Sequence, residues 1–170
     1  RAFLGIPAAA ELGKILKKCE GDGEIYPTAP EDTALITFTS GSSGEPKGAN
    51  RTHGFLTAQY RALCDVFPVR EDDVDMPMFP VFALRNLARG IPSVIPDINF
   101  LRLADMKGET LCRQIMRHGV TTCTASPLCI DRLAEYARGR ISLRRILTGG
   151  APVTDEQLQA WRRAFPETEI

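Results

Sequence analysis

The sequence predicts an α/β fold in which helices flank a mainly parallel sheet. Two observations lead to this prediction. Strand-like runs and helical stretches alternate along the chain, and residues that start or end helices stand at the junctions between them. Repeated strand–helix units of this length are typical of parallel sheets, because parallel strands need a crossover connection.

The first part of the chain offers one strand between two helices. Apolar residues at helical spacing predict a helix over Ala8–Lys18. Gly21–Pro30 is rich in glycine and proline and is expected to be a loop. Ala34–Thr39 is β-branched and aromatic, which predicts a strand. A loop is expected over Ser40–Gly48, and helical spacing returns over His53–Phe67.

The middle of the chain continues the alternation. Short strands are predicted over Val74–Met78 and Ser93–Ile95. A helix is predicted over Glu109–Arg117, and Gly119 stands where a glycine commonly ends a helix. Val120–Ala125 reads as the next strand.

The last part carries the clearest helix starts. Ser126–Pro127 combines an N-cap residue with a proline at the first helical position, and that helix is expected to run to about Arg138. A strand over Leu143–Leu147 follows. Thr154–Gln157 reads as a capping box, and the helix that it starts is expected to end near Phe165.

Composition bounds the function classes. The 170 residues (18.7 kDa) are 44% hydrophobic and 25% charged, with 21 Lys plus Arg against 21 Asp plus Glu. This balance argues against nucleic acid or an anionic membrane as the main partner. No apolar run approaches the ~18 residues of a membrane span. Five cysteines without a close pair predict reduced thiols in a cytoplasmic protein and no structural metal site.

Three other features have ordinary structural interpretations. The basic cluster Arg138, Arg140, Arg144 and Arg145 is expected to be solvated, because no aromatic residues interleave it as in a single-stranded nucleic-acid site. His53 is expected to be structural. His118 stands at a helix end, where a positive charge is favourable.

A glycine-rich loop follows the first predicted strand and is the most informative segment. Its glycines let backbone amides approach an anion, and its hydroxyls and lysine add donors and charge, as a polyphosphate site requires. It is neither a Walker A loop, since Gly48 follows Lys47, nor a G-x-G-x-x-G fingerprint. A solvated linker is the alternative interpretation. The candidate phosphate-binding residues are Thr39, Ser40, Gly41, Ser42, Ser43, Gly44 and Lys47.

The order T-S-G-S-S-G-E-P-K-G resembles the phosphate-binding signature of the adenylate-forming (AMP-binding) superfamily. Further on, F-P-V-F-A-L, then Gly90, then S-V-I-P-D is similar to the olefin-biosynthesis β-lactone synthetases. Arg85 and the stretch Asn99–Arg102 depart from that branch. The resemblance implies that residues 1–170 are an internal piece of the large N-terminal domain, without the C-terminal domain, and inactive alone.

The same resemblance implies further site residues. The turn Gly149, Gly150, Ala151 and Pro152 resembles the Gly-Gly-Ala-Pro turn that lies against adenine and the acyl group, although a plain strand-to-helix turn would look the same. Candidates for an acyl pocket are Phe79, Val81, Phe82 and Ser126. Ser126 could equally be a simple N-cap. No catalytic residue is assigned within the chain.

The implied substrates are ATP with Mg²⁺ and a small-molecule carboxylic acid, which form an acyl-adenylate and pyrophosphate. In the β-lactone branch the acid would be a β-hydroxy fatty acid, whose own hydroxyl displaces AMP. The alternatives are an acyl-CoA or acyl-carrier-protein ligase of the same superfamily, which would use coenzyme A or a carrier, and a non-catalytic nucleotide-binding module.

Overall fold

A computed structural model describes residues 23–40, 46–100, 102–137 and 139–170. The chain forms two compact units, residues 1–59 and 60–170. The helix predicted over Ala8–Lys18 lies outside the described residues. No helix in the described ranges is long and apolar enough to cross a membrane.

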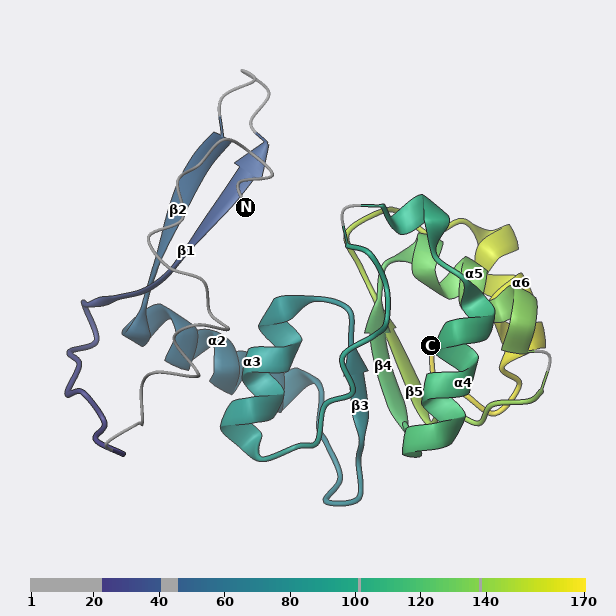
Figure 1. The fold of residues 1–170 in the computed structure, drawn as a ribbon, viewed down its shortest axis with the longest axis horizontal. Helices are drawn as coiled ribbons and strands as arrows, with labels where there is room; N and C mark the ends of the chain where they lie inside the picture. Colours follow the sequence, from purple (N-terminus) through teal and green to yellow (C-terminus); the bar gives the residue numbers. More distant parts are fainter. Residues whose placement is uncertain (1–22, 41–45, 101, 138) are drawn as a thin grey trace, which may run out of the picture. The chain divides into compact units, whose positions relative to one another are not determined.

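The described part of the first unit is built on an antiparallel hairpin. Strand β1 (Thr33–Ser40) pairs with β2 (Pro46–Thr52), and helix α2 (His53–Val66) follows directly (Figure 1). The predicted strand and helix are therefore confirmed. The loop expected over Ser40–Gly48 is shorter than predicted, because Ser40 ends β1 and Pro46, Lys47 and Gly48 belong to β2.

The side chain of Phe38 explains how Gly48 fits into a strand. The two residues are opposite each other in the ladder, and a Cβ placed on Gly48 would stand 3.3 Å from Cε1 of Phe38. The aromatic ring thus lies against Gly48 across the ladder, although both residues are exposed. Sequence composition alone does not reveal such a cross-strand contact.

The second unit contains the parallel sheet that the sequence predicts. Its strands are β3 (Asp75–Pro77), β4 (Thr122–Ala125) and β5 (Arg145–Thr148), in the order β3-β4-β5. All neighbouring pairs are parallel, with Met76, Cys123 and Ile146 in register. The strand expected over Ser93–Ile95 is reduced to an isolated parallel bridge between Ser93 and Asp75.

One face of this sheet is apolar and is covered by three helices, α4 (Gly108–His118), α5 (Pro127–Ala137) and α6 (Asp155–Ala164), as Figure 1 shows. Alternation along a strand places Met76, Cys123 and Ile146 on this face. They join a buried core in which Trp161 is completely inaccessible to solvent. Other large members of that core are Leu111, Ile115, Ile130, Leu133, Leu143 and Phe165.

The predicted helix ends are confirmed in atomic detail. Gly119 ends α4 with φ of 60°, in the left-handed region that favours glycine. Thr154 and Gln157 form both hydrogen bonds of a capping box at the start of α6, and Phe165 ends that helix.

Helix α3 (Pro80–Arg89) was not predicted, and it packs against β3. Its signals are local: Pro80 occupies the first turn, and Gly90 ends the helix with φ of 76°. The only other helix in the described ranges absent from the predictions is a short 3₁₀ turn over Leu103–Asp105.

The cysteines within the described residues are free thiols. Cys112, Cys123 and Cys129 are buried and Cys64 is half-buried, as expected of small apolar residues. Burial raises the pKa of the Cys112 and Cys123 thiols, so these groups stay protonated at neutral pH.

Candidate functional site

Three predicted site segments follow the carboxyl ends of the three parallel strands. Phe79 comes shortly after β3, Ser126 directly after β4, and Gly149 directly after β5. Carboxyl ends of parallel strands meet at one edge, where open α/β sheets bind their ligands. We call Phe79, Ser126 and Gly149–Pro152 the carboxyl-edge cluster.

The structure brings two members of this cluster into contact. A Cβ placed on Gly150 would stand 3.7 Å from Cζ of the Phe79 ring. Gly150 also has φ of 85°, a conformation that side chains rarely adopt. The glycine turn therefore lies directly against the aromatic ring, although the two residues are far apart in the sequence.

Phe79 is the residue that immediately precedes helix α3, and its backbone is extended, with φ of −113° and ψ of 127°. Val81 and Phe82 stand in the first turn of that helix, and all three side chains are half-buried. The Phe82 ring lies 6.5 Å from that of Phe79 and 6.4 Å from that of Phe67, measured between centroids. These rings form one partly exposed aromatic group, and its role as an acyl surface remains a prediction.

Ser126 is half-buried and interacts within its own helix turn. Its Oγ donates to Sγ of Cys129 at 3.2 Å, and its carbonyl oxygen accepts from the Ile130 amide at 3.1 Å. Its position at the edge agrees with either interpretation from the sequence, an acyl-pocket residue or a helix start.

The phosphate-binding candidates lie at the tip of the hairpin in the first unit. Thr39 pairs with Lys47, and Ser40 with Pro46, so the ladder holds the two ends of the loop beside each other. Lys47 is exposed. The central candidates Gly41, Ser42, Ser43 and Gly44 lie outside the described residues, and the phosphate-binding assignment stays a prediction.

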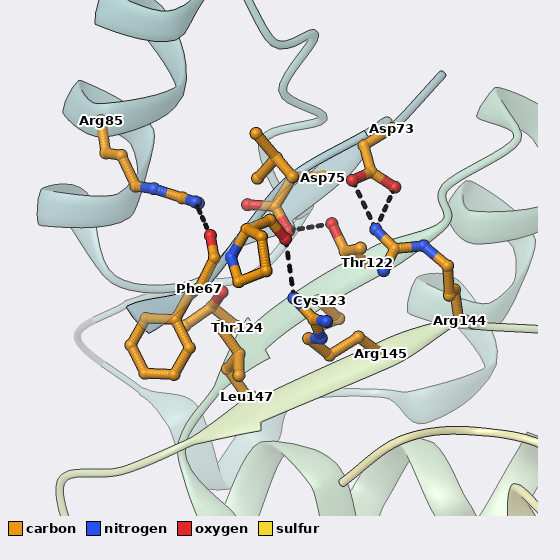
Figure 2. A pocket seen from close by; sticks show the side chains of 12 residues that line it. Phe67, Asp73, Asp75, Arg85, Thr122, Cys123, Thr124, Arg144, Arg145 and Leu147 are labelled. Atoms are coloured by element: carbon orange, nitrogen blue, oxygen red, sulfur yellow. Dashed lines mark hydrogen bonds and ion pairs between the residues drawn. The ribbon is translucent and has the colours of Figure 1, made fainter. Parts of the chain in front are cut away.

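A polar cluster that the sequence did not predict lies at the opposite, amino-terminal edge of the sheet (Figure 2). Both carboxylate oxygens of buried Asp73 accept from Nη2 of Arg144, and Oδ1 accepts from Oγ1 of Thr121 at 2.9 Å. Burial acts to raise the pKa of Asp73, but the hydrogen bonds from Arg144, from the Arg70 amide and from Thr121 outweigh it and hold that pKa below its usual value.

Arg144 and Arg145 therefore correct the expectation of a solvated basic surface. Arg145 donates to Glu169 at 2.7 Å and to the carbonyl oxygen of Pro68 at 2.8 Å. Both arginines therefore pair with groups of the same unit. The sequence did offer a signal. Arg144 and Arg145 stand at the start of β5, and Asp73 and Asp75 stand at the start of β3, just before or within each strand. The amino ends of parallel strands share an edge of the sheet.

Asp75 forms a second polar connection on the face of the sheet opposite the helical core (Figure 2). Its Oδ1 accepts from Thr122 at 2.7 Å, and its Oδ2 accepts from the side-chain amide of Asn86 at 2.7 Å. Burial raises the pKa of Asp75 despite these two hydrogen bonds.

Comparison with known proteins decides the family. The model of the AMP-binding enzyme family matches residues 6–170. The chain belongs to the AMP-binding enzyme family. It is 36% identical over 159 residues to an olefin β-lactone synthetase of Xanthomonas campestris pv. campestris, covering 91% of this chain and 29% of that protein. It is 37% identical over 147 residues to an olefin β-lactone synthetase of Stenotrophomonas maltophilia, covering 86% and 27%.

A solved structure supports the fold independently. O-succinylbenzoate coenzyme A synthetase of Bacillus subtilis, in complex with ATP and magnesium ion, matches with a TM-score of 0.73 at 21% identity, over 90% of this chain and 33% of that one. This match confirms the predicted α/β class, and the family match confirms the predicted superfamily. The chain spans less than a third of the length of the two β-lactone synthetases.

Proposed function

We propose that the complete protein containing this chain uses ATP to activate a β-hydroxy fatty acid and closes it to a β-lactone. The observation that carries the proposal is the 36% and 37% identity to two olefin β-lactone synthetases over most of the chain. The order of motifs agrees with it, from the glycine-rich loop through F-P-V-F-A-L to the Gly-Gly-Ala-Pro turn.

The proposed reaction has two steps. A carboxylate oxygen of the acid attacks the α-phosphorus of ATP, and the bond to the leaving pyrophosphate breaks, which gives the acyl-adenylate. The β-hydroxyl oxygen then attacks the acyl carbon and loses its proton. The bond from that carbon to the phosphate oxygen breaks, so the products are the β-lactone, AMP and a proton.

In this proposal the hairpin tip binds the phosphates. Lys47 and the backbone amides of its loop stabilise the charge that moves onto pyrophosphate, a role in which fixed donors are effective. Magnesium is expected to arrive with ATP and to offset phosphate charge, because Mg²⁺ is usually held by substrate phosphates and one or two carboxylates. Among the described residues, no group of three or more His, Cys, Asp or Glu could hold a metal ion.

The carboxyl-edge cluster would receive the adenylate. Gly150 lacks the side chain that would separate its backbone from a flat ligand, and Phe79 supplies an aromatic surface beside it. Val81 and Phe82 extend that surface along the first turn of α3. An apolar surface beside a backbone turn suits an aliphatic acid joined to a nucleotide.

A coenzyme A ligase is the second candidate. The observation that favours it is the structural match to a coenzyme A synthetase, which shares this fold. Both candidates make the same adenylate and differ only in the nucleophile of the second step.

Product analysis separates the two. The complete protein is incubated with ATP, magnesium and a β-hydroxy fatty acid, with and without coenzyme A, and the products are identified by mass spectrometry. A β-lactone formed without coenzyme A is expected. A thioester that appears only with coenzyme A would refute lactone formation, and no ATP–pyrophosphate exchange with any acid would refute adenylation itself.

A further inference from the structure

We propose that Asn86 is a positioning residue that fixes helix α3 against the sheet and thereby sets the acyl selectivity of the carboxyl-edge cluster. This inference rests on the proposed function. Asn86 stands in the middle of α3 and is completely inaccessible to solvent. It is not among the residues that the sequence indicated for the site.

The side-chain amide of Asn86 connects three segments. Its Nδ2 donates to Oδ2 of Asp75 at 2.7 Å, on strand β3, and to Oγ of Ser93 at 3.0 Å, after the helix. Asp75 in turn accepts from Thr122 on strand β4 at 2.7 Å. One amide therefore ties α3 to the first strand directly and to the second strand through a shared carboxylate.

The buried side chains of helix α3 are polar. Every residue of α3 is described, and the buried ones are Arg85 and Asn86, both polar. Its large apolar residues Leu84 and Leu87 are 44% and 80% exposed. Arg85 adds a second directional contact, from Nη2 to the carbonyl oxygen of Phe67 (Figure 2). Hydrogen bonds fix direction as well as distance, whereas apolar burial does not.

The carbonyl oxygen of the Asn86 side chain accepts no hydrogen bond within the described part of the chain. A buried amide with an unpaired oxygen is costly for stability. Stability alone would favour an apolar residue here together with an apolar partner. An unpaired oxygen beside two donated hydrogen bonds points to a requirement for the orientation of α3.

The orientation of α3 determines where the aromatic surface lies. The helix begins directly after Phe79, and the Phe79 ring contacts the Gly150 turn. Because a helix of this length moves as a rigid body, a shift at Asn86 moves Phe79 and Phe82 relative to Gly150. Under the proposed function the acyl chain lies against the surface that ring and turn form together, so their relative position would discriminate between acids.

The test compares Asn86→Ala with Thr121→Val in the complete protein. Thr121→Val also removes partly buried hydrogen bonds of the same sheet, to Asp73 at 2.9 Å and from the Val74 amide at 3.1 Å, but neither of them reaches helix α3. ATP–pyrophosphate exchange is measured with two β-hydroxy acids of different chain length. Exchange reports adenylation whether the final product is a lactone or a thioester.

We expect Asn86→Ala to change the ratio of kcat/KM for the two acids by at least about fivefold, a size typical of altered apolar pockets. The KM for ATP should change less than about twofold, and Thr121→Val should leave the ratio unchanged. If Asn86→Ala fails to fold, Ser93→Ala, which removes one of the two acceptors, should shift the ratio in the same direction by less.

The outcomes distinguish the positioning role of Asn86 from the proposed function. Equal losses of kcat/KM for both acids in Asn86→Ala, or in Ser93→Ala if only that variant folds, would overturn the positioning role. A shift in the ratio for Thr121→Val as large as for Asn86→Ala would also overturn it. Absence of exchange in the unmodified protein would instead refute the proposed function.

Discussion

Gly108 is the position where a single methyl group should do most damage to the packing of the core helices. It is the first residue of α4, and a Cβ there would stand 1.9 Å from the carbonyl oxygen of Arg132 on α5. Ordinary van der Waals contact begins at 3.4 Å, so Gly108→Ala requires the two helices to separate by about 1.5 Å (3.4 minus 1.9). Backbone atoms on α5 cannot rotate away as a side chain would.

The free-energy cost follows from that separation. Overpacking in a well-packed core costs about 1–3 kcal/mol and occasionally more. The better helix propensity of alanine offsets at most about 1 kcal/mol, and less at the first residue of a helix. We therefore expect Gly108→Ala to lower the free energy of unfolding by about 2 kcal/mol. The destabilisation should come from looser packing of Leu111 and Cys112, the side chains that this part of α4 contributes to the core.

Denaturant unfolding of the complete protein, followed by tryptophan fluorescence, is the assay. Trp161 lies in the same core and reports on its opening. Gly149→Ala is the matched control, because no atom lies within 4 Å of its Cβ position and its φ is not positive. An unfolding midpoint for Gly108→Ala equal to that of the control would refute the close approach of α4 and α5.

Three further predictions concern charge, core and site. Arg144→Gln should cost about 3 kcal/mol of unfolding free energy at neutral pH, because it leaves the buried Asp73 carboxylate without its cation. The pKa of Asp73 is lowered in the fold, so the stability that the ionised carboxylate contributes is complete above the ordinary pKa of 3.8 and is lost as pH falls below it. The difference in unfolding free energy between Arg144→Gln and the unmodified protein should therefore narrow below that pH, as urea unfolding across pH would measure. Trp161→Phe should cost about 2 kcal/mol, since it removes the hydrogen bond from the indole to Asp131 at 2.7 Å, and an unchanged urea midpoint would contradict this. Lys47→Ala should slow ATP–pyrophosphate exchange by at least about tenfold, and an unchanged rate would remove its proposed role.

The sequence predicted those features of the fold that local chemistry determines. Gly119 and the capping box of Thr154 carry their signals within a few residues, and both were located correctly. Helix α3 was missed although Pro80 and Gly90 mark its two ends, and its buried residues are polar rather than apolar. Gly48 was assigned to a loop because the Phe38 ring that packs against it comes from the neighbouring strand.

The site shows the same division between local and distant information. Placing Phe79, Ser126 and the Gly149–Pro152 turn after successive strands required only the parallel topology, which the sequence indicated. The contact between Phe79 and Gly150 depends on where each strand ends, which the residues near each end do not determine. Asp73 and Arg144 form an ion pair although they are far apart in the sequence, so no short-range pattern connects them.

The most direct test of the central claim follows the oxygen atoms of the substrate. The complete protein is given ATP, magnesium and a β-hydroxy fatty acid whose carboxylate is labelled with heavy oxygen. If the carboxylate attacks the α-phosphorus, one labelled oxygen must appear in AMP and the other in the carbonyl of the β-lactone. Unlabelled AMP, or label found in inorganic phosphate beside ADP, would contradict the adenylate mechanism on which this account is built.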